Sequence, residues 1–214
     1  MSSIHLEIFD HKRLELFKIL KVFGDNGYLA GGTGLALQIN HRKSYDFDVF
    51  LPNEITNSLR REVERLFGDV SYLVDSGDQL SFQTKDMVNV TFLWYYFKPL
   101  KPFISTRSLP LASVEDIAAD KAHTMGRRAA WRDYVDIYWM LHKGLQTLES
   151  ISKYASHKFG GAFNETQFLE QLTYYEDVAF TPIQFIEESP SNQEIQSYLQ
   201  QVVEEYAKKR LAEK

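Results

Sequence analysis

The 214-residue chain contains no cysteine, which excludes disulfides and thiolate chemistry and fits a reducing compartment. It also lacks any apolar run near the ~20 residues that a membrane-spanning helix needs. Charged residues are spread through its first residues, where a signal peptide would need an apolar stretch. We therefore expect a soluble, cytoplasmic protein with no membrane attachment.

An excess of basic charge is missing as well. The formal net charge is -5, which argues against wholesale wrapping of nucleic acid but leaves room for a local basic patch. Hydrophobic residues make up 44% of the chain, enough to bury the core of one large domain or two small ones. The charged fraction of 25% is that of a globular chain rather than a disordered one.

Proline is scarce, and three of the six prolines fall within residues 98–110. Because proline interrupts helices and strands, this stretch is the best candidate for a linker. Helical and strand patterns are mixed before it, and only helical patterns follow it. We predict a first domain at 1–105 and a helical domain at 106–214.

Apolar periodicity defines the elements expected in each domain. Before the linker we expect helices at 10–25, 33–40 and 52–67, and strands at 28–30, 46–51, 70–75, 80–84 and 88–97. This order suits a small mixed sheet with helices on one face. After the linker we expect a bundle of helices at 113–128, 132–143, 148–159, 165–174 and 192–211. The fold class is therefore α+β.

An acidic pair, Asp46 and Asp48, lies in the strand predicted at 46–51. Residues two apart on a strand share a face and lie about 6.6 Å apart along it. Two carboxylates held so close repel each other unless a cation lies between them, and Mg²⁺ takes such oxygen ligands. The alternative is a solvated strand face, which is the commoner reason for an isolated Asp-x-Asp.

A glycine-rich turn, "GGTG" at residues 31–34, joins a short strand to the next helix. Glycine lets the backbone adopt positive φ and approach a ligand, and the first turn of a helix offers free N–H groups to a phosphate. The alternative is a tight turn without a ligand. The sequence matches neither a P-loop nor a dinucleotide fingerprint.

The turn and the acidic pair say more together than apart, because a phosphate site followed by a metal-binding strand would hold a nucleoside triphosphate. "GGTGLAL" and "HRKSYDFDVF" closely resemble the polymerase-β-like nucleotidyltransferase superfamily, and within it the AbiEii/AbiGii toxin family. The positions that carry this resemblance are Gly31, Gly32, Thr33, His41, Arg42, Ser44, Asp46 and Asp48.

The helical half resembles the same family through "LASVEDIAADKAHTMGRRAAWRDYVDIYWML". The matching positions are Asp116, Lys121, Arg127, Arg128, Arg132, Asp133 and Asp136. The resemblance covers roughly residues 20 to 145, and four separated motifs occur in the same order.

The resemblance implies a polymerase-β-like core, with the helical domain contributing to the active-site cleft. It also implies a Mg²⁺-dependent (or Mn²⁺-dependent) nucleotidyltransferase that moves a nucleoside monophosphate from an NTP onto a hydroxyl group. The acceptor would be the 3′ end of a tRNA or a protein side chain. The setting would be a toxin–antitoxin or phage-abortive system, with a cognate antitoxin protein as partner.

Roles follow from the same resemblance. The metal ligands would be Asp46 and Asp48. The nucleotide-binding set would be Gly31, Gly32, Thr33, Arg42, Ser44 and Lys121. The catalytic set would be Asp46, Asp48, Lys121, Asp133 and Asp136.

For the helical residues, the physical argument leaves alternatives open. Lys121 suits a triphosphate as a point charge, and Asp133 or Asp136, at i and i+3, could orient it. The alternative is a surface helix with ion pairs such as Arg132–Asp136. The adjacent Arg127 and Arg128 could contact the phosphates of an acceptor, or they could be ordinary solvated charges.

One feature departs from the superfamily pattern. A third carboxylate is expected on a neighbouring strand, and the residues in that place are Asn89 and Thr91. Asp86 is close, but on an unbroken strand it would point to the core face, so either a bulge redirects it or the third acid is missing. His41 is then a candidate base.

Two other functions use the same residues. A kinase would move the γ-phosphate of the same nucleotide. Alternatively, a module without the third acid would bind a nucleotide or a partner and not turn it over.

Overall fold

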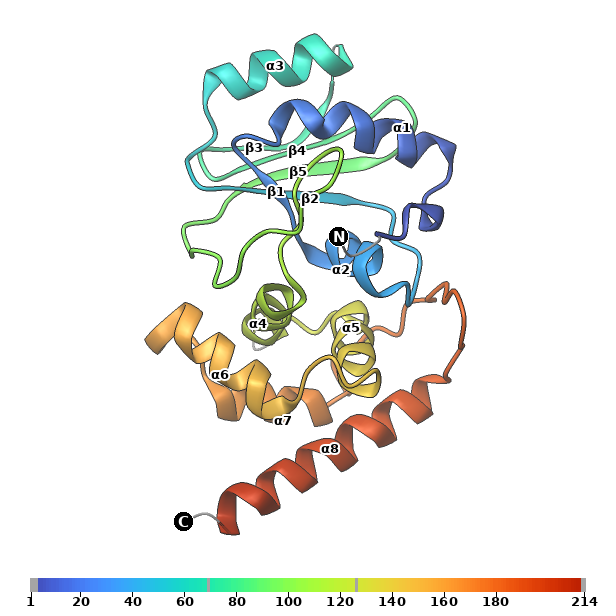
Figure 1. Ribbon diagram of the computed structural model, residues 1–214, viewed down its shortest axis with the longest axis vertical. Helices are drawn as coiled ribbons and strands as arrows, with labels where there is room; N and C mark the ends of the chain where they lie inside the picture. Colours follow the sequence, from blue (N-terminus) through green and yellow to red (C-terminus); the bar gives the residue numbers. More distant parts are fainter. Residues whose placement is uncertain (1–3, 69, 126, 213–214) are drawn as a thin grey trace. The chain divides into compact units, whose positions relative to one another are not determined.

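The computed structural model describes residues 4–68, 70–125 and 127–212 of the chain. They belong to two units, Met1–Ser113 and Val114–Lys214, each of which is described by itself (Figure 1). The first unit contains the sheet, and the second is helical.

A five-stranded mixed sheet forms the first unit, as the strand patterns predicted. Its order is β1-β2-β5-β4-β3, in which only the β2–β5 pair is parallel. The strands are β1 (Tyr28–Leu29), β2 (Phe47–Leu51), β3 (Tyr72–Asp75), β4 (Gln79–Gln83) and β5 (Asn89–Trp94).

One face of the sheet carries the core of this unit. Phe47 and Val49 of β2 are completely buried, and the ring of Phe17 lies 6.3 Å from that of Phe47. On β4, Phe82 packs at 5.2 Å from Phe67. The apolar side of each alternating strand is thus covered by α1 (His11–Ile19), η2 (Leu20–Phe23) and α3 (Asn57–Phe67), which lie above the sheet in Figure 1.

Helix α2 (Gly31–Ile39) lies on the other face, where its first residue touches the Asp48 side chain (Figure 1). The expectation that all helices cover one face is therefore wrong. Alternation along β2 directs Asp48 away from Phe47 and Val49, so an element that meets Asp48 must lie on the polar side.

The boundary between the units follows from hydrogen bonds beside β1. The Leu29 N–H donates to the Pro110 carbonyl oxygen at 2.8 Å, and the Ala112 N–H donates to the Leu29 carbonyl oxygen at 2.9 Å. Leu109 and Leu111 are completely buried. Part of the proline-rich stretch is thereby built into the first unit, and the division falls at 113 rather than at 105.

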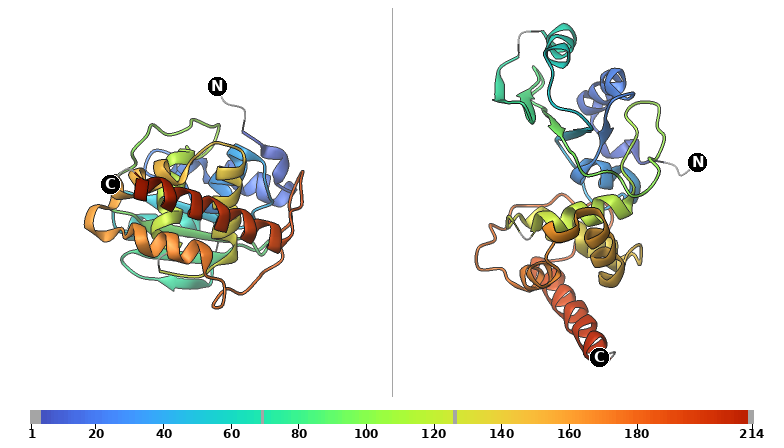
Figure 2. Two further views of the ribbon diagram at one scale, coloured as in Figure 1. Left: turned by 90° about the horizontal axis from the view of Figure 1, so that it is seen from below. Right: turned by 90° about the vertical axis from the view of Figure 1, so that its left-hand side faces the viewer.

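The second unit consists of helices at the expected places. They are α4 (Val114–Met125), α5 (Trp131–His142), α6 (Leu148–Phe159), α7 (Glu165–Thr173) and α8 (Asn192–Ala212), with the short η3 (Gly160–Ala162) after α6. The first was expected to reach residue 128, but it ends at Met125, and Gly126 lies outside the described residues. Helix α8 packs against α5, α6 and α7 (Figure 2).

None of the helices in the described residues is both long enough and apolar enough to cross a membrane.

A buried lysine joins α6 to α4. Lys158 Nζ lies 2.9 Å from Asp116 Oδ1 and 2.7 Å from Asp120 Oδ1, and the Lys158 and Asp116 side chains are both 1% exposed. Charges taken so far out of water are tolerated only when paired. The packing of these two helices therefore depends on all three charges being present.

Replacing Lys158 by Ala should lower the free energy of unfolding by about 3–5 kcal/mol, because two carboxylates lose their buried counter-charge. Lys209→Ala is the matched control, since Lys209 pairs with Glu149 at 2.7 Å on the exposed surface of α8 and α6. It should change stability far less. Urea unfolding followed by circular dichroism compares the two, and equal losses would contradict this account.

Candidate nucleotide and metal site

The glycine turn lies directly against the second aspartate. Helix α2 begins at Gly31, so the glycines form its first turn and not a loop before Thr33. Gly31 has a φ of +61°, a left-handed conformation that favours glycine. A Cβ atom here would lie 2.8 Å from Asp48 Oδ2, closer than such atoms can approach. Glycine therefore makes room for the carboxylate, and the turn and Asp48 are neighbours.

Thr33 fastens α2 to the segment that carries the first aspartate. It is 2% exposed, and its Oγ1 lies 2.7 Å from Ser44 Oγ and donates to the Asp46 carbonyl oxygen. Of the residues predicted to bind nucleotide, Thr33 and Ser44 make buried contacts within the protein. Gly31 and Gly32 are only half-buried.

The aspartates share one face of the sheet, as their spacing predicted. Asp46 immediately precedes β2 and Asp48 lies within it. Both are half-buried, whereas the alternating Phe47 and Val49 are completely buried on the opposite face. The structure therefore brings the two carboxylates and the first turn of α2 together on the polar side of the sheet.

The third position holds no acid. Parallel pairing places Thr91 opposite Asp48, and Asn89 Nδ2 donates to Asp46 Oδ1 at 3.2 Å. Asp86 lies in the exposed turn between β4 and β5, where its carboxylate is 3.3 Å from the Lys12 ammonium. Across 4–68, 70–125 and 127–212, no three His, Asp or Glu side chains are grouped to hold a metal ion.

The sequence did not predict two rows of hydrogen-bonded polar side chains, which run across the sheet from β4 to β5 in the direction of the aspartates. Ser81 Oγ donates to Thr91 Oγ1 at 3.1 Å, and Gln83 Nε2 donates to Asn89 Oδ1 at 3.1 Å. The signal was present as the alternating polar residues of "QLSFQ" at 79–83. Only the register of β4 against β5 shows which residues they meet.

Two further predicted residues, His41 and Arg42, are buried in the first unit at 1% and 3% exposure. Arg42 Nη1 donates to the Lys43 carbonyl oxygen at 3.1 Å. A general base must reach the hydroxyl proton that it abstracts, so the burial of His41 does not favour that role.

The helical unit contains a buried charge cluster of its own. Lys121 Nζ lies 2.6 Å from both Asp133 Oδ1 and Asp136 Oδ2, and Arg128 Nε lies 3.1 Å from Asp133 Oδ2. Asp133 and Asp136 are 1% and 0% exposed. The alternative of a solvated helix surface is therefore wrong for these two aspartates, which hold Lys121 between α4 and α5.

The electrostatics of this cluster favour the ionised form of Asp133. Burial by itself raises the pKa of Asp133, but the positive charges of Lys121 and Arg128 outweigh it. The net pKa lies below the ordinary value of 3.8. Asp133 therefore remains a carboxylate at neutral pH and keeps its salt bridge to Lys121.

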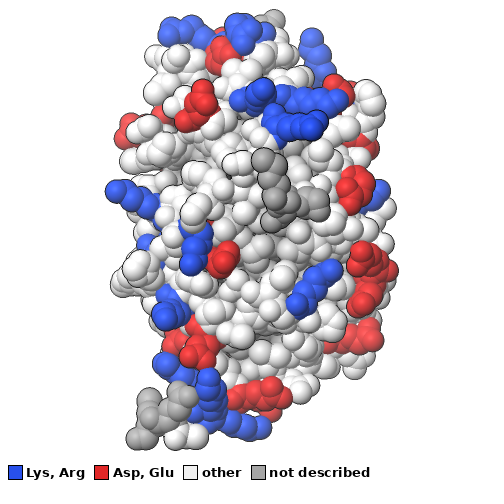
Figure 3. All heavy atoms as spheres, in the orientation of Figure 1, with Lys and Arg blue, Asp and Glu red and all other residues white. Residues whose placement is uncertain are grey.

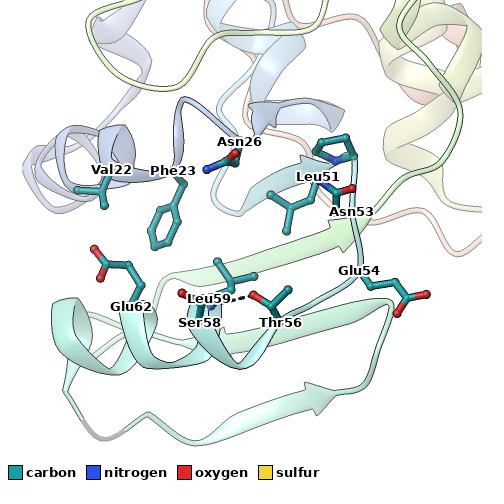
Figure 4. Close-up of a pocket in the computed structure, with 11 residues that line it drawn as sticks. Val22, Phe23, Asn26, Leu51, Asn53, Glu54, Thr56, Ser58, Leu59 and Glu62 are labelled. Atoms are coloured by element: carbon teal, nitrogen blue, oxygen red, sulfur yellow. Dashed lines mark hydrogen bonds between the residues drawn. The ribbon is translucent and has the colours of Figure 1, made fainter.

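A cavity of about 400 Å³ lies in the first unit, away from the aspartates. Phe23, Leu59 and Glu62 face one another across it, and Leu51, on the core side of β2, also lines it (Figure 4). This cavity is therefore not the predicted site.

On the face seen in Figure 3, acidic and basic side chains are interspersed, with one cluster of basic side chains over α1.

Solved structures of other proteins share this fold. A structure described as "Crystal structure of putative nucleotidyltransferase from H. pylori" has a TM-score of 0.59 at 17% identity and covers 96% of this chain and 98% of its own. MenT4, a nucleotidyltransferase toxin of Mycobacterium tuberculosis H37Rv, has a TM-score of 0.58 at 13% identity and covers 89% and 80%. The fold is that of a nucleotidyltransferase.

The family is shown by sequence. The family described as "Nucleotidyl transferase AbiEii toxin, Type IV TA system" matches residues 79–212, more than half of the chain. The chain belongs to this family and is a nucleotidyltransferase. The match begins after Asp48 and extends past residue 145 to the last helix, where we had expected little resemblance.

A relative in Aquifex aeolicus (strain VF5), "Uncharacterized protein aq_aa25", is 29% identical over 184 residues, which are 84% of this chain and 87% of the relative.

Replacing Gly31 by Ala should destabilise the first unit and displace the Asp48 carboxylate, because the new Cβ has no room. Gly144→Ala is the control, since Gly144 has a similar φ of +65° but no atom within 4 Å of its added Cβ. In Gly144→Ala the free energy of unfolding should fall by only about 1–2 kcal/mol, which is the cost of a left-handed conformation for alanine, and activity should be retained. Urea unfolding and nucleotidyl-transfer assays test both, and an active Gly31→Ala protein would contradict the contact.

Asp133→Asn should remove a stabilising charge whose effect depends on pH. Because the folded pKa is lowered, the contribution is fully present above the unfolded value of 3.8 and is lost as the pH falls through the folded pKa. The gap in unfolding free energy between wild type and variant should therefore narrow as the pH is lowered from about 6 to about 3. Urea titrations over this range measure it, and a gap independent of pH would disprove the assignment.

Proposed function

We propose that this nucleotidyltransferase moves a nucleoside monophosphate from an NTP onto a hydroxyl acceptor, with one divalent cation held by Asp46 and Asp48. The observation that carries the proposal is the contact between Gly31 and Asp48. This contact supports the proposal because the start of α2, with its free N–H groups, then lies beside a pair of carboxylates on the same face of the sheet.

The carboxylates fit a hard divalent cation. Asp46 and Asp48 offer oxygen ligands from one face, and both are half-buried, so a ligand can reach them. Mg²⁺ and Mn²⁺ take such ligands and keep positions for water and phosphate oxygens. When bound, the ion would supply positive charge to the reacting phosphate. With an amide and a hydroxyl in the third position, the residues fit a single ion.

The first turn of α2 would bind the phosphates. N–H groups in the first turn of a helix have no partner within the helix, and the helix dipole favours an anion there. The half-buried Gly31 and Gly32 leave the backbone open to a ligand, whereas buried Thr33 holds this turn against the Asp46 segment. Thr33 and Ser44 would thus shape the site more than contact the nucleotide.

The reaction is a substitution at the α-phosphorus. An acceptor hydroxyl oxygen forms the new P–O bond, the bond from the α-phosphorus to its bridging oxygen breaks, and pyrophosphate leaves with that electron pair. The hydroxyl proton passes to solvent or to a base. Asp46 and Asp48 would hold the cation, which would supply positive charge at the phosphate, and the α2 N–H groups would stabilise the charge that develops on the phosphate oxygens.

Lys121 stays in the proposal as a phosphate-binding cation, with Asp133 and Asp136 as its orienting partners. Lys121 Nζ lies 2.6 Å from a carboxylate oxygen of each aspartate, and these two contacts fix the ammonium in one place. Removal of Lys121 would leave both aspartates buried without their shared counter-charge, so loss of activity alone would not prove a catalytic role.

The family supports a biological role as a toxin. Its description names a toxin of a type IV toxin–antitoxin system, and MenT4 is described as a toxin. We infer a toxin that modifies the 3′ end of a tRNA or a protein hydroxyl and that is counteracted by an antitoxin. Its use of NTP would place it in the cytoplasm.

A second candidate is a module that binds nucleotide without turnover. The amide at 89 and the hydroxyl at 91 favour it, because they replace the acid that would complete a two-metal site. Such a module would gain thermal stability from an NTP and never form a product.

Incubation with Mg²⁺, a tRNA pool and α-labelled NTP should label an acceptor, and γ-labelled NTP should not. Asp46→Ala should reduce the labelling by at least about 100-fold, because the cation loses a direct ligand. The control is Asp86→Ala, which removes an equally charged residue on the exposed turn. Label from the γ-position only would show a kinase, and full activity in Asp46→Ala would refute the metal role.

A further inference from the structure

The Asp46 carboxylate is connected to β4 through a row of amides. Gln83 Nε2 donates to Asn89 Oδ1 at 3.1 Å, and Asn89 Nδ2 donates to Asp46 Oδ1 at 3.2 Å. The register aligns the row, since Gln83 pairs with Asn89 across β4 and β5. All three residues are half-buried, where hydrogen bonds are stronger than in water.

The row has a direction. A carboxylate only accepts hydrogen bonds, so Asn89 must present its NH₂ group to Asp46 and its oxygen away from it. Gln83 enforces this orientation, because its own NH₂ group faces the Asn89 oxygen. If Asn89 turned over, its oxygen would face the carboxylate and the donor from Gln83 would face an NH₂ group.

A second row on the same face is different. Gln79 Nε2 donates to Ser81 Oγ at 2.8 Å, and Ser81 Oγ donates to Thr91 Oγ1 at 3.1 Å. Hydroxyl groups both donate and accept and can rotate, so this row has no enforced direction. It provides a matched comparison on the same strands.

We propose that Asn89 is a positioning residue for Asp46, that Gln83 holds it in the orientation that donates, and that this row sets the affinity of the site for a divalent cation. The inference rests on the proposed function, because it assumes that Asp46 is a metal ligand. Partners that hydrogen-bond a ligating carboxylate fix its orientation, and their loss weakens metal binding by about 10–100-fold.

Gln83→Glu tests the direction of the row. A carboxylate at 83 accepts from the Asn89 NH₂ group, which turns the Asn89 oxygen toward Asp46 and removes its donor. Gln79→Glu adds the same charge to the same face of β4, where the hydroxyl groups adapt. We expect Gln83→Glu to bind Mn²⁺ about 10-fold more weakly than Gln79→Glu.

Asn89→Asp tests whether the side chain at position 89 lies beside a carboxylate that binds metal. It places a third carboxylate beside Asp46, as in a three-acid metal site. Without metal the like charges should lower the melting temperature, and Mn²⁺ should restore it by a larger shift than in the wild type. The opposite signs of the Gln83→Glu and Asn89→Asp effects on Mn²⁺ binding distinguish positioning from general loss of structure.

Isothermal titration of the metal-free, full-length proteins with Mn²⁺ and no nucleotide measures these affinities. Circular dichroism verifies folding, and Gln83→Leu, which removes the donor without adding charge, replaces Gln83→Glu if that variant does not fold. Gln83→Glu and Gln79→Glu with equal affinities, or Asn89→Asp without a larger Mn²⁺ shift, would overturn the inference. Wild-type protein that binds Mn²⁺ no better than Asp46→Asn would instead refute the proposed metal site.

Discussion

The contact between Gly31 and Asp48 is the constraint on which the site depends. A backbone with positive φ and no side chain lets the start of α2 approach a carboxylate on β2. Thr33 then ties the same helical turn to the Asp46 backbone. As a result, the N–H groups that would bind phosphate and the acids that would bind a cation occupy one side of the sheet. The apolar side remains free to form the core.

The two units handle charge in different ways. In the sheet unit, Asp46 and Asp48 are half-buried. In the helical unit, Lys121 and Lys158 are buried and each lies between two aspartates. A buried charge without its partner strongly destabilises the folded state, so these ion pairs favour one packing arrangement of α4, α5 and α6. Lys158 thus has a structural explanation, whereas Lys121 could also serve the chemistry that the family implies.

The polar face of the sheet departs from a three-carboxylate site in a specific way. An amide at 89 donates to Asp46, and a hydroxyl at 91 stands opposite Asp48. An amide cannot replace a carboxylate as a charged ligand, but it can orient one. A nucleotidyltransferase with this arrangement would depend on the position of its two remaining acids, and for Asp46 we propose that the row from Gln83 sets it.

The sequence by itself determined the α+β class, the helical second half and the shared face of Asp46 and Asp48, because local periodicity encodes all three. It also placed the glycine turn next to a helix start. Only the tertiary structure decided that α2 lies on the polar face, that residues 109–112 join the first unit, and that Asp86 pairs with Lys12. The same holds for the neighbours of Asn89, because strand register and contacts between residues far apart in the chain leave no local signal.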